Sequence, residues 1–270
     1  MDYYRKDGNI YLKRQDFDLA QTLDCGQAFR WSEIAGGYSG TALNKPLTIT
    51  DSAESADTIV LHDTTEDDLL NFWANYFDLY TDYSELKRRF SEDETLRAAC
   101  KFAGGIRLLR QNPWEALCSF IISQNNNIPR IKGIISRLCE MCGGFPEPSL
   151  LAVKTPDDLA PLRAGFRARY IIDAAQKVSN ESISLEEVRK LPLAAAEKKL
   201  MEIVGVGIKV ADCTLLYGLW RTDAFPVDVW IKRVLAEYYP NGFPTEFDDT
   251  RGIAQQYLFH YIRCKEKNLL

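Results

Sequence analysis

The sequence predicts an α+β fold, in which an N-terminal antiparallel β-sheet layer is followed by a bundle of about eight helices. Three observations lead to this prediction. Short runs of aromatic and β-branched residues fill the first sixty positions, as they do in strands. Helical patterns with capping signals then continue almost to the end of the 270-residue chain. Late in the chain, a Gly-x-Gly turn separates two helical segments. We expect a sheet domain over residues 1–85 and a helical domain over residues 86–270.

Four segments near the start have the composition of strands. They are separated by the turn-forming runs AGG, NKP and DSAESAD. The segments are QAFRWSEI (27–34), GYSGTAL (37–43), KPLTIT (45–50) and DTIVLHD (57–63). Together they predict an antiparallel sheet of four or five strands.

Capping residues mark the starts of the expected helices. Thr65 and Ser184 each precede an acidic residue by three positions, which is typical of a helix N-terminus. Asn112 stands before a proline suited to a first helical position, and Thr155-Pro predicts a further helix start. The run NNNIP separates the apolar helix WEALCSFIIS from the helix PRIKGIISRLCEMCGG, whose glycines suit a left-handed cap.

The composition is that of a globular protein, with 46% hydrophobic and 26% charged residues. No apolar run approaches the ~20 residues of a membrane span, and the N-terminus MDYYRKDGNIYLKRQD lacks the apolar core of a secretory signal. We therefore expect an intracellular protein. The seven cysteines are odd in number and form no framework, which favours free thiols. The isolated pair Cys139-x-x-Cys142 is interpreted as packing at a helix end rather than a metal or redox site.

The charge is unevenly distributed, although the net value of −5 is unfavourable for a polyanionic partner. Residues 51–94 hold thirteen acids and three bases, whereas residues 101–137 hold six bases and one acid. A second basic segment, residues 163–177, contains only one acid, Asp173. Its bases are Arg163, Arg167, Arg169 and Lys177. An anion could therefore bind the middle of the chain without meeting its acidic part, although solvated helix faces would give the same pattern.

The segment VGVGIKVADC (204–213) predicts a helix-hairpin-helix. Glycines allow close approach of the backbone to an anion, and the first N–H groups of the second helix have no partner inside that helix. Together with the helix dipole they make a phosphate seat. A plain helix corner is the structural alternative. A dinucleotide-binding fingerprint is disfavoured, because Val210 replaces its third glycine and no strand precedes the turn.

Lys209 stands in the first turn of that second helix, where a cation opposes the helix dipole. This position favours either a phosphate contact or a neutral, nucleophilic amine. Asp228, in FPVDVWIKRVL, occupies the expected N-cap of the next helix after a stiff proline. Its carboxylate either only caps the helix or is also aimed at a reaction site.

These residues carry a resemblance to a known family. Gly205-x-Gly207-x-Lys209-Val-Ala-Asp-Cys213, followed by Pro226-Val-Asp228, resembles the helix-hairpin-helix DNA glycosylases with a Gly/Pro…Asp signature. Four further blocks are similar to the 8-oxoguanine DNA glycosylase/lyase branch, namely GQAFRW (26–31), GIRLLRQNPWEALCSFIISQNNNIPRI (105–131), GFRARY (165–170) and IAQQYLF (253–259). The resemblance covers most of the chain.

The resemblance implies a role for each matching residue. Lys209 would attack the sugar C1′ of the damaged nucleotide and form a Schiff base, and Asp228 would stabilise the positive charge on the sugar. The target base leaves the DNA stack to reach such a site. Residues implied to form the pocket for the damaged base are Gly26, whose carbonyl would accept the N7 hydrogen of 8-oxoguanine, with Cys213, Pro226, Gln255 and Phe259.

The rest of the implied site contacts the remaining DNA. Asn125 would enter the gap left by the flipped base, Phe166 would wedge beside it, and Arg130 and Arg167 would bond the orphaned cytosine. Gly205, Gly207 and Val210 would contact phosphates. The chain departs from the family where Phe166 replaces tyrosine, Val204 replaces proline before the hairpin glycine, and Trp230 replaces histidine.

The expected activity is bifunctional excision of 8-oxoguanine opposite cytosine from double-stranded DNA by a monomer, as in base excision repair. We expect no cofactor. An iron–sulfur cluster is disfavoured because only Cys264 follows Cys213, while a structural monovalent or divalent cation at the hairpin is left open. Two alternatives remain: a glycosylase for alkylated purines, and a non-catalytic DNA-binding hairpin protein.

Overall fold

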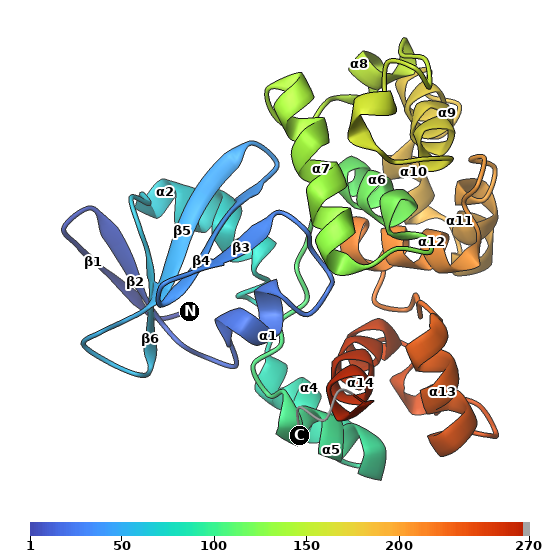
Figure 1. Ribbon diagram of the computed structural model, residues 1–270. Coiled ribbons are helices and arrows are strands. Elements are labelled where there is room, and N and C mark those ends of the chain that lie inside the picture. The colour runs from blue at the N-terminus through green and yellow to red at the C-terminus, as the bar shows by residue number, and fades with distance from the viewer. Residues whose placement is uncertain (267–270) are drawn as a thin grey trace. The chain divides into compact units, whose positions relative to one another are not determined.

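The computed structural model describes residues 1–266, and backbone contacts divide the chain into two compact units. The sheet unit comprises Met1–Arg110 and Val227–Leu270, and the hairpin unit comprises Gln111–Pro226. These units group the helices that follow the sheet with the C-terminal segment, because α14 packs on α5 and α13 (Figure 1). The expected division at residue 85 stays a prediction.

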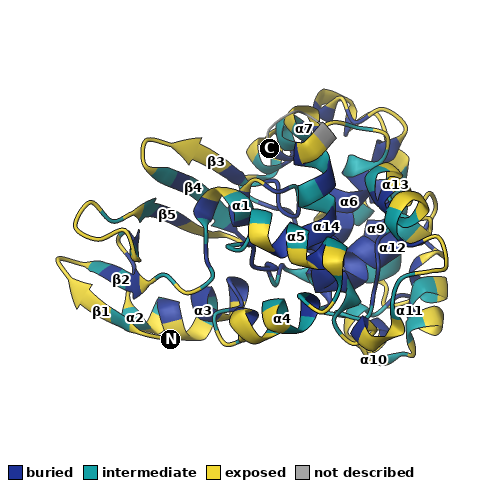
Figure 2. Ribbon diagram, turned by 90° about the horizontal axis from the view of Figure 1, so that it is seen from below, coloured by how far each residue is buried: buried dark blue, intermediate teal, exposed yellow. Residues whose placement is uncertain are grey.

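The sheet unit contains an antiparallel six-stranded sheet within the described residues, with the order β1-β2-β6-β5-β4-β3. The strands are β1 (Tyr3–Lys6), β2 (Asn9–Lys13), β3 (Trp31–Ile34), β4 (Gly37–Ala42), β5 (Lys45–Asp51) and β6 (Thr58–Leu61). Leu61 pairs with both Ile10 and Ile49, and all three side chains are fully buried. Alternation thus places one face of β2, β4 and β5 in the apolar core, while the outer strand β1 is largely exposed (Figure 2).

Strands β1 and β2 are not among the predicted strands. They form a hairpin whose turn residues, Asp7 and Gly8, both have positive φ values, of 50° and 79°. An Asp-Gly pair between alternating residues is the signal for such a turn. The six-stranded sheet therefore includes the four predicted strands and this N-terminal hairpin.

Short helices complete the sheet unit, and acidic or hydroxyl side chains cap most of their N-termini. They are α1 (Leu19–Leu23), α2 (Glu66–Asp68), a π-helical turn (Leu69–Trp73), α3 (Ala74–Tyr76), α4 (Tyr83–Phe90), α5 (Glu94–Phe102), α13 (Val229–Tyr238), a 3-10 turn (Thr245–Phe247) and α14 (Arg251–Glu266). Thr65 caps α2 through its hydroxyl, as predicted. The hydroxyl of Tyr257 on α14 donates to the carbonyl of Ile106 at 2.9 Å and ties that helix to the segment after α5.

The hairpin unit is helical throughout its regular structure. Its elements are α6 (Pro113–Ser123), α7 (Ile128–Cys142), α8 (Pro148–Ala152), a 3-10 turn (Ala160–Leu162), α9 (Arg167–Ser179), α10 (Leu185–Lys190), α11 (Leu193–Leu200), α12 (Ile208–Cys213) and a π-helical turn (Thr214–Gly218). Helix α6 is buried from Trp114 to Ile122 and packs against α7, α9 and α12 (Figures 1 and 2). It is the central helix of this unit, and the predicted caps at Asn112 and Ser184 are confirmed.

One predicted helix start is wrong. Thr155-Pro opens a turn that leads into the 3-10 segment, and no α-helix begins there. The carboxylate of Asp158 accepts the N–H of Thr155 at 2.7 Å and closes the turn on itself. Pro161 then disfavours α-helical geometry at the residue before it and has no N–H to extend a helix.

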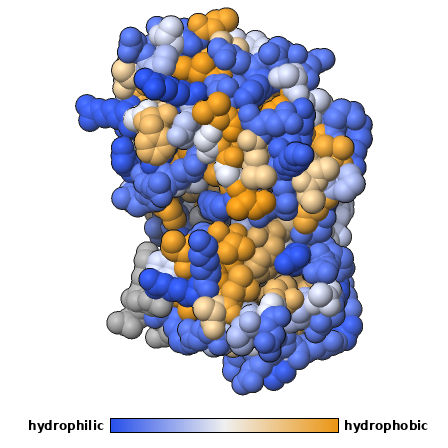
Figure 3. All heavy atoms as spheres, turned by 90° about the vertical axis from the view of Figure 1, so that its right-hand side faces the viewer, coloured by the Kyte–Doolittle hydropathy of each residue, from blue (hydrophilic) through white to orange (hydrophobic). Residues whose placement is uncertain are grey.

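Hydrophilic side chains predominate on the face shown in Figure 3, with apolar side chains lying between them. Within residues 1–266, no helix combines the length and the apolar character needed to cross a membrane.

Candidate functional site

The hairpin turn joins α11 to α12 and has the expected glycines at its two critical positions. The N–H of Val206 donates to the carbonyl of Ile203 at 3.0 Å, and Gly205 has a φ of +78°. A Cβ atom at Gly205 would lie 2.3 Å from the ring of Tyr170, whereas one at Gly207 would meet no atom within 4 Å. Gly205 is thus required by the fold, while Gly207 leaves open space at the N-cap of α12.

Lys209 is the second residue of α12 and projects beside α6. Its Nζ lies 3.4 Å from the hydroxyl oxygen of Ser123 and 5.3 Å from the ring centroid of Phe120. In the described part of the chain the amine has no ion-pair partner. A half-buried amine that forms no ion pair within the described residues can approach a substrate atom, as a nucleophile must.

Asp228 caps α13, as the sequence predicted. Its Oδ1 accepts the N–H groups of Trp230 at 3.0 Å and Ile231 at 2.9 Å. Its Oδ2 has no hydrogen-bond donor within residues 1–266. The cap therefore fixes the direction of the carboxylate and leaves one oxygen available for another partner. Asp228 belongs to the sheet unit and Lys209 to the hairpin unit.

The residues expected to contact the damaged base divide between the units. In the sheet unit, Gly26 follows α1 with a φ of +93°, and Gln255 (3% exposed) and the half-buried Phe259 lie four positions apart on α14. In the hairpin unit, Cys213 ends α12 and Pro226 is buried near the end of the segment. Their contact with a base stays a prediction.

Gln27 supports the backbone beside Gly26, and the sequence analysis did not single it out. Its buried amide nitrogen donates to the carbonyls of Thr22 and Arg107, both at 2.8 Å, and its amide oxygen accepts the N–H of Leu109 at 2.9 Å. Three hydrogen bonds to two segments hold the loop in place. A glutamine beside a glycine offers no sequence signal for this role, since two of its three partners lie some eighty residues away.

The three consecutive asparagines between α6 and α7 have three separate roles. Asn127 caps α7 by accepting the N–H of Arg130 at 3.0 Å, and Asn126 donates to the carbonyl of Ile122 at 3.1 Å. Asn125 is exposed, has a φ of +46°, and its side chain makes no hydrogen bond within the described residues. It is therefore the asparagine whose side chain remains available for a ligand.

Arg167 holds this asparagine turn from α9. Its Nε donates to the carbonyl of Gln124 at 2.9 Å, and its Nη2 donates to the carbonyl of Asn125 at 3.1 Å. The guanidinium group is buried, and burial, followed by the nearby charge of Arg130, lowers its pKa. Arg167 thus has a structural task here, and its expected bond to cytosine stays a prediction.

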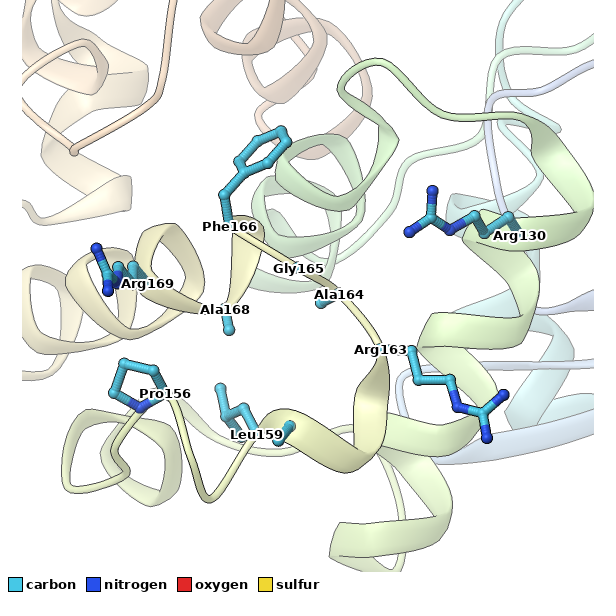
Figure 4. A pocket seen from close by; sticks show the side chains of 10 residues that line it. Arg130, Pro156, Leu159, Arg163, Ala164, Gly165, Phe166, Ala168 and Arg169 are labelled. Atoms are coloured by element: carbon cyan, nitrogen blue, oxygen red, sulfur yellow. The ribbon is translucent and has the colours of Figure 1, made fainter.

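A hollow of about 630 Å³ lies beside the asparagine turn and α9 (Figure 4). Pro156, Leu159 and alanines give it an apolar lining. Arg130, Arg163 and Arg169 also line it, and none of these guanidinium groups forms an ion pair in the described part of the chain. Arg130 extends from α7 in the direction of Phe166, which is 50% exposed. Unpaired cations around an apolar hollow suit a ligand with phosphate and flat apolar groups.

The described residues contain no group of three or more His, Cys, Asp or Glu side chains that could hold a metal ion. None of the seven cysteines forms a disulfide in this part of the chain, in agreement with the expectation from their odd number. Burial raises the pKa of the Cys25 thiol to about 12, so this cysteine beside Gly26 is an unreactive core residue.

Comparison with known proteins gives consistent matches over nearly the whole chain. Residues 9–117 match the N-terminal domain of 8-oxoguanine DNA glycosylase, and residues 118–246 match the HhH-GPD superfamily of base excision DNA repair proteins. The chain is 31% identical over 277 residues to the N-glycosylase/DNA lyase of Saccharomyces cerevisiae, covering 87% of this chain and 71% of that protein.

Two solved structures show the same fold at substantial identity. MBOgg1 in complex with a low-affinity DNA ligand has a TM-score of 0.91 and 40% identity, covering 98% of this chain and 100% of that one. The Clostridium acetobutylicum 8-oxoguanine glycosylase/lyase, in complex with double-stranded DNA containing cytosine opposite 8-oxoG, has a TM-score of 0.89 and 34% identity, covering 99% of both chains.

Proposed function

The chain belongs to the 8-oxoguanine DNA glycosylase family of helix-hairpin-helix base excision repair proteins, and we propose that Lys209 and Asp228 carry its chemistry. It is a bifunctional enzyme that excises 8-oxoguanine opposite cytosine from double-stranded DNA and has lyase activity at the resulting abasic site. The observation that supports the catalytic assignment most strongly is the half-buried amine of Lys209, which lacks an ion-pair partner in the described chain.

Lys209 is the nucleophile in this proposal. Its neutral amine attacks the sugar C1′, the glycosidic bond breaks, and its electron pair leaves with the base, which takes up a proton. The amine then gives one proton to Asp228, the C1′–O4′ bond breaks as O4′ takes up a proton, and a protonated Schiff base forms between Nζ and C1′. Removal of a proton from C2′ then allows β-elimination of the 3′ phosphate. The aromatic ring of Phe120 and the hydroxyl of Ser123 hold the amine at the start of α12.

Asp228 stabilises the positive charge that develops on the sugar as the base departs. Its cap bonds fix Oδ1, so Oδ2 points in a defined direction without further side-chain ordering during the reaction. A carboxylate organised before the reaction is more effective than one that must reorient. The same oxygen can accept a proton from the attacking amine.

Recognition of the damaged base follows from one hydrogen bond. The carbonyl of Gly26 accepts the N7 hydrogen that 8-oxoguanine has and guanine lacks, so guanine would leave a buried carbonyl unpaired. Gln255 contacts the edge of the base, while Phe259 and Cys213 cover its faces beside Pro226. The anchoring of the loop by Gln27 supports this role, because discrimination requires a carbonyl that does not move.

On the opposite strand, Asn125 fills the gap left by the flipped nucleotide, Phe166 stacks beside it, and Arg130 bonds the orphaned cytosine. Arg167 keeps the asparagine turn in shape and offers a remaining N–H to the same base. The hollow lined by Arg130, Arg163 and Arg169 receives the sugar and phosphate groups of that strand. The positive charge at its rim supports this assignment in a protein of net charge −5.

The hairpin contacts the phosphates of the damaged strand through the backbone N–H groups of Gly205 and Gly207. The N–H of Val210, which was also expected to contact a phosphate, donates to the carbonyl of Gly207 at 3.0 Å. The proposed reaction uses an amine and a carboxylate of the chain and includes no cofactor, and a structural cation at the hairpin would serve only to bind phosphate. Since the substrate is DNA, we place the protein where the chromosome lies, at the nucleoid in the cytoplasm if the source is bacterial and in the nucleus if it is eukaryotic.

Borohydride trapping tests the assignment of Lys209. A duplex with 8-oxoguanine opposite cytosine should give a covalent adduct with the wild type and with Lys198→Gln, an exposed control on α11, but none with Lys209→Gln. An adduct that persists in Lys209→Gln would refute the assignment.

Asp228→Asn should slow excision by about a hundredfold or more while changing the melting temperature little, because asparagine caps helices as well as aspartate does. A large loss of thermal stability with normal excision would make Asp228 a cap alone.

A further inference from the structure

The hairpin turn has a conformation in which its second residue is commonly proline. The turn runs from Ile203 to Val206, has a hydrogen bond between its ends, and has a positive φ at Gly205 but not at Val204. This is the pattern of a type II turn, whose second position favours proline because the ring fixes φ near −65°. In this chain the position is occupied by Val204, which is 53% exposed and carries an N–H that proline would lack.

That N–H is bonded to a side chain on α9. The N–H of Val204 donates to Oδ2 of Asp173 at 2.7 Å, across a sequence separation of 31 residues. The same carboxylate accepts a bond from Nζ of Lys177 at 2.9 Å, and Lys177 also donates to the carbonyl of Glu202 at 2.6 Å. Two side chains one helical turn apart therefore bind the residues on both sides of Ile203.

A third residue of α9 contacts the next position of the turn. The ring of Tyr170 lies against Gly205 so closely that no Cβ atom would fit there. Tyr170, Asp173 and Lys177 are spaced at three and four residues, so they share one side of the helix. Tyr170 fixes the turn by packing, and Asp173 and Lys177 fix it by charge-assisted hydrogen bonds.

We propose that Asp173 is a positioning residue for catalysis, whose carboxylate orders the hairpin turn where proline would otherwise stiffen it. The turn ends at Val206, Gly207 is the N-cap of α12, and Lys209 follows within the first turn of that helix. The conformation of the turn therefore sets the direction in which the amine points. Lys177 balances the charge of Asp173, which keeps a carboxylate from repelling phosphate at the hairpin. The inference rests on the proposed role of Lys209 as the nucleophile.

The decisive comparison uses proline as a chemical substitute. Asp173→Ala should reduce the single-turnover rate of adduct trapping by about tenfold, since small displacements of a reacting group are costly, while the Kd for the same DNA changes less than about threefold. Val204→Pro in the Asp173→Ala background should restore the rate to within about twofold of Val204→Pro alone. An unchanged rate in Asp173→Ala, or a double variant as slow as Asp173→Ala, would overturn the proposal.

Two further variants separate positioning from general stability. Asp173→Asn retains an oxygen that can accept the N–H of Val204, so it should keep most of the rate; a loss as large as that of Asp173→Ala would contradict the hydrogen-bond role. Asn180→Ala is the matched control, because Asn180 also accepts a backbone N–H, that of Ser182 at 3.0 Å, at the far end of α9. It should leave the trapping rate unchanged.

Amide exchange measured by NMR gives a readout that does not depend on catalysis. The Val204 amide should exchange slowly in the wild type and at least about tenfold faster in Asp173→Ala. If the wild type forms no adduct while the Val204 amide exchanges faster in Asp173→Ala than in the wild type, the proposed role of Lys209 is wrong and the ordering of the turn by Asp173 is supported. If the adduct forms and the Val204 amide exchanges equally fast in both proteins, the ordering of the turn by Asp173 is wrong and the proposed role of Lys209 is supported.

Discussion

Two turns of the hairpin unit are held by the same helix in opposite ways. The asparagine turn between α6 and α7 is fixed through its carbonyls, to which the guanidinium group of Arg167 donates. The hairpin turn between α11 and α12 is fixed through an N–H, which the carboxylate of Asp173 accepts. Both contacts come from α9, at positions six residues apart.

The difference follows from what each turn has to leave free. When its carbonyls are occupied, the asparagine turn presents the side chain of Asn125 in a left-handed conformation. When the N–H at its start is occupied, the hairpin keeps a defined path into α12, whose first two N–H groups, those of Ile208 and Lys209, remain available to an anion. One turn is thus built to present a side chain, and the other to present its backbone.

Gly205→Ala should give the largest effect, because it attacks the hairpin turn directly. The added Cβ would collide with the ring of Tyr170 and would require a positive φ. These two penalties together amount to about 2–5 kcal/mol of unfolding free energy. Thermal and urea unfolding measure the loss, and a stable Gly205→Ala variant with normal DNA binding would show that the turn can open without harm.

Gly207→Ala is the matched control for that experiment. A Cβ there meets no atom within 4 Å, so the stability should fall by no more than about 1 kcal/mol. If phosphate approaches the backbone at this point, the Kd for duplex DNA should nevertheless rise about tenfold. Unchanged DNA affinity would mean that the open space at Gly207 is not the phosphate seat.

Arg167→Met should give the next largest effect and tests the asparagine turn. Loss of the donors leaves the carbonyls of Gln124 and Asn125 without their partner, at a cost of about 1–3 kcal/mol. Urea unfolding should show this loss, whereas Arg169→Met, the exposed arginine two positions on, should unfold like the wild type. Equal stability of the two variants would show that the hydrogen bonds of Arg167 contribute nothing to the free energy of unfolding.

Arg163→Gln should have a smaller effect, confined to DNA binding. Because its guanidinium group lines the hollow without an ion pair in the described chain, its loss should reduce the slope of log K against log salt by about 1. The stability should stay unchanged. Arg189→Gln, on the exposed side of α10, is the control. Identical salt slopes for the two variants would show that the hollow does not contact DNA.

The last effect depends on the pH at which these comparisons are made. Burial, followed by the charge of Arg263, lowers the pKa of His260 in the sheet unit from 6.5 to about 4. The unfolded chain therefore takes up this proton first as the pH falls, and the folded protein loses stability between pH 6.5 and about 4. His260→Leu should lose less stability than the wild type over this window, as pH-dependent urea unfolding would show. Parallel curves would assign the loss to other groups.

Much of the fold could be predicted because its signals are local. Four strands, the cap at Asn112 and the hairpin glycines follow from patterns within a few residues. The N-terminal hairpin was missed although Asp7-Gly8 marks it. The helix start predicted at Thr155-Pro was wrong because the side chain of Asp158 closes a turn there.

The candidate site was less accessible from the sequence wherever a residue acts through a distant partner. Lys209 and Asp228 stand out through helix position and motif, so both could be named as candidates. Gln27 and Asp173 could not, since each acts through backbone groups that only the fold brings to it. Val204 was recognised as a departure from the family, but the carboxylate that occupies its N–H is 31 residues away.

The bond between Asp173 and Val204 also has a consequence for how this chain can evolve. A proline arising at position 204 would remove the N–H that Asp173 accepts, and selection on the carboxylate would then relax. Loss of Asp173 first would instead leave a loosened hairpin until a proline appeared. The two replacements are therefore tolerated in one order and opposed in the other, so we expect lineages to pass through proline at 204 before they lose the acid at 173.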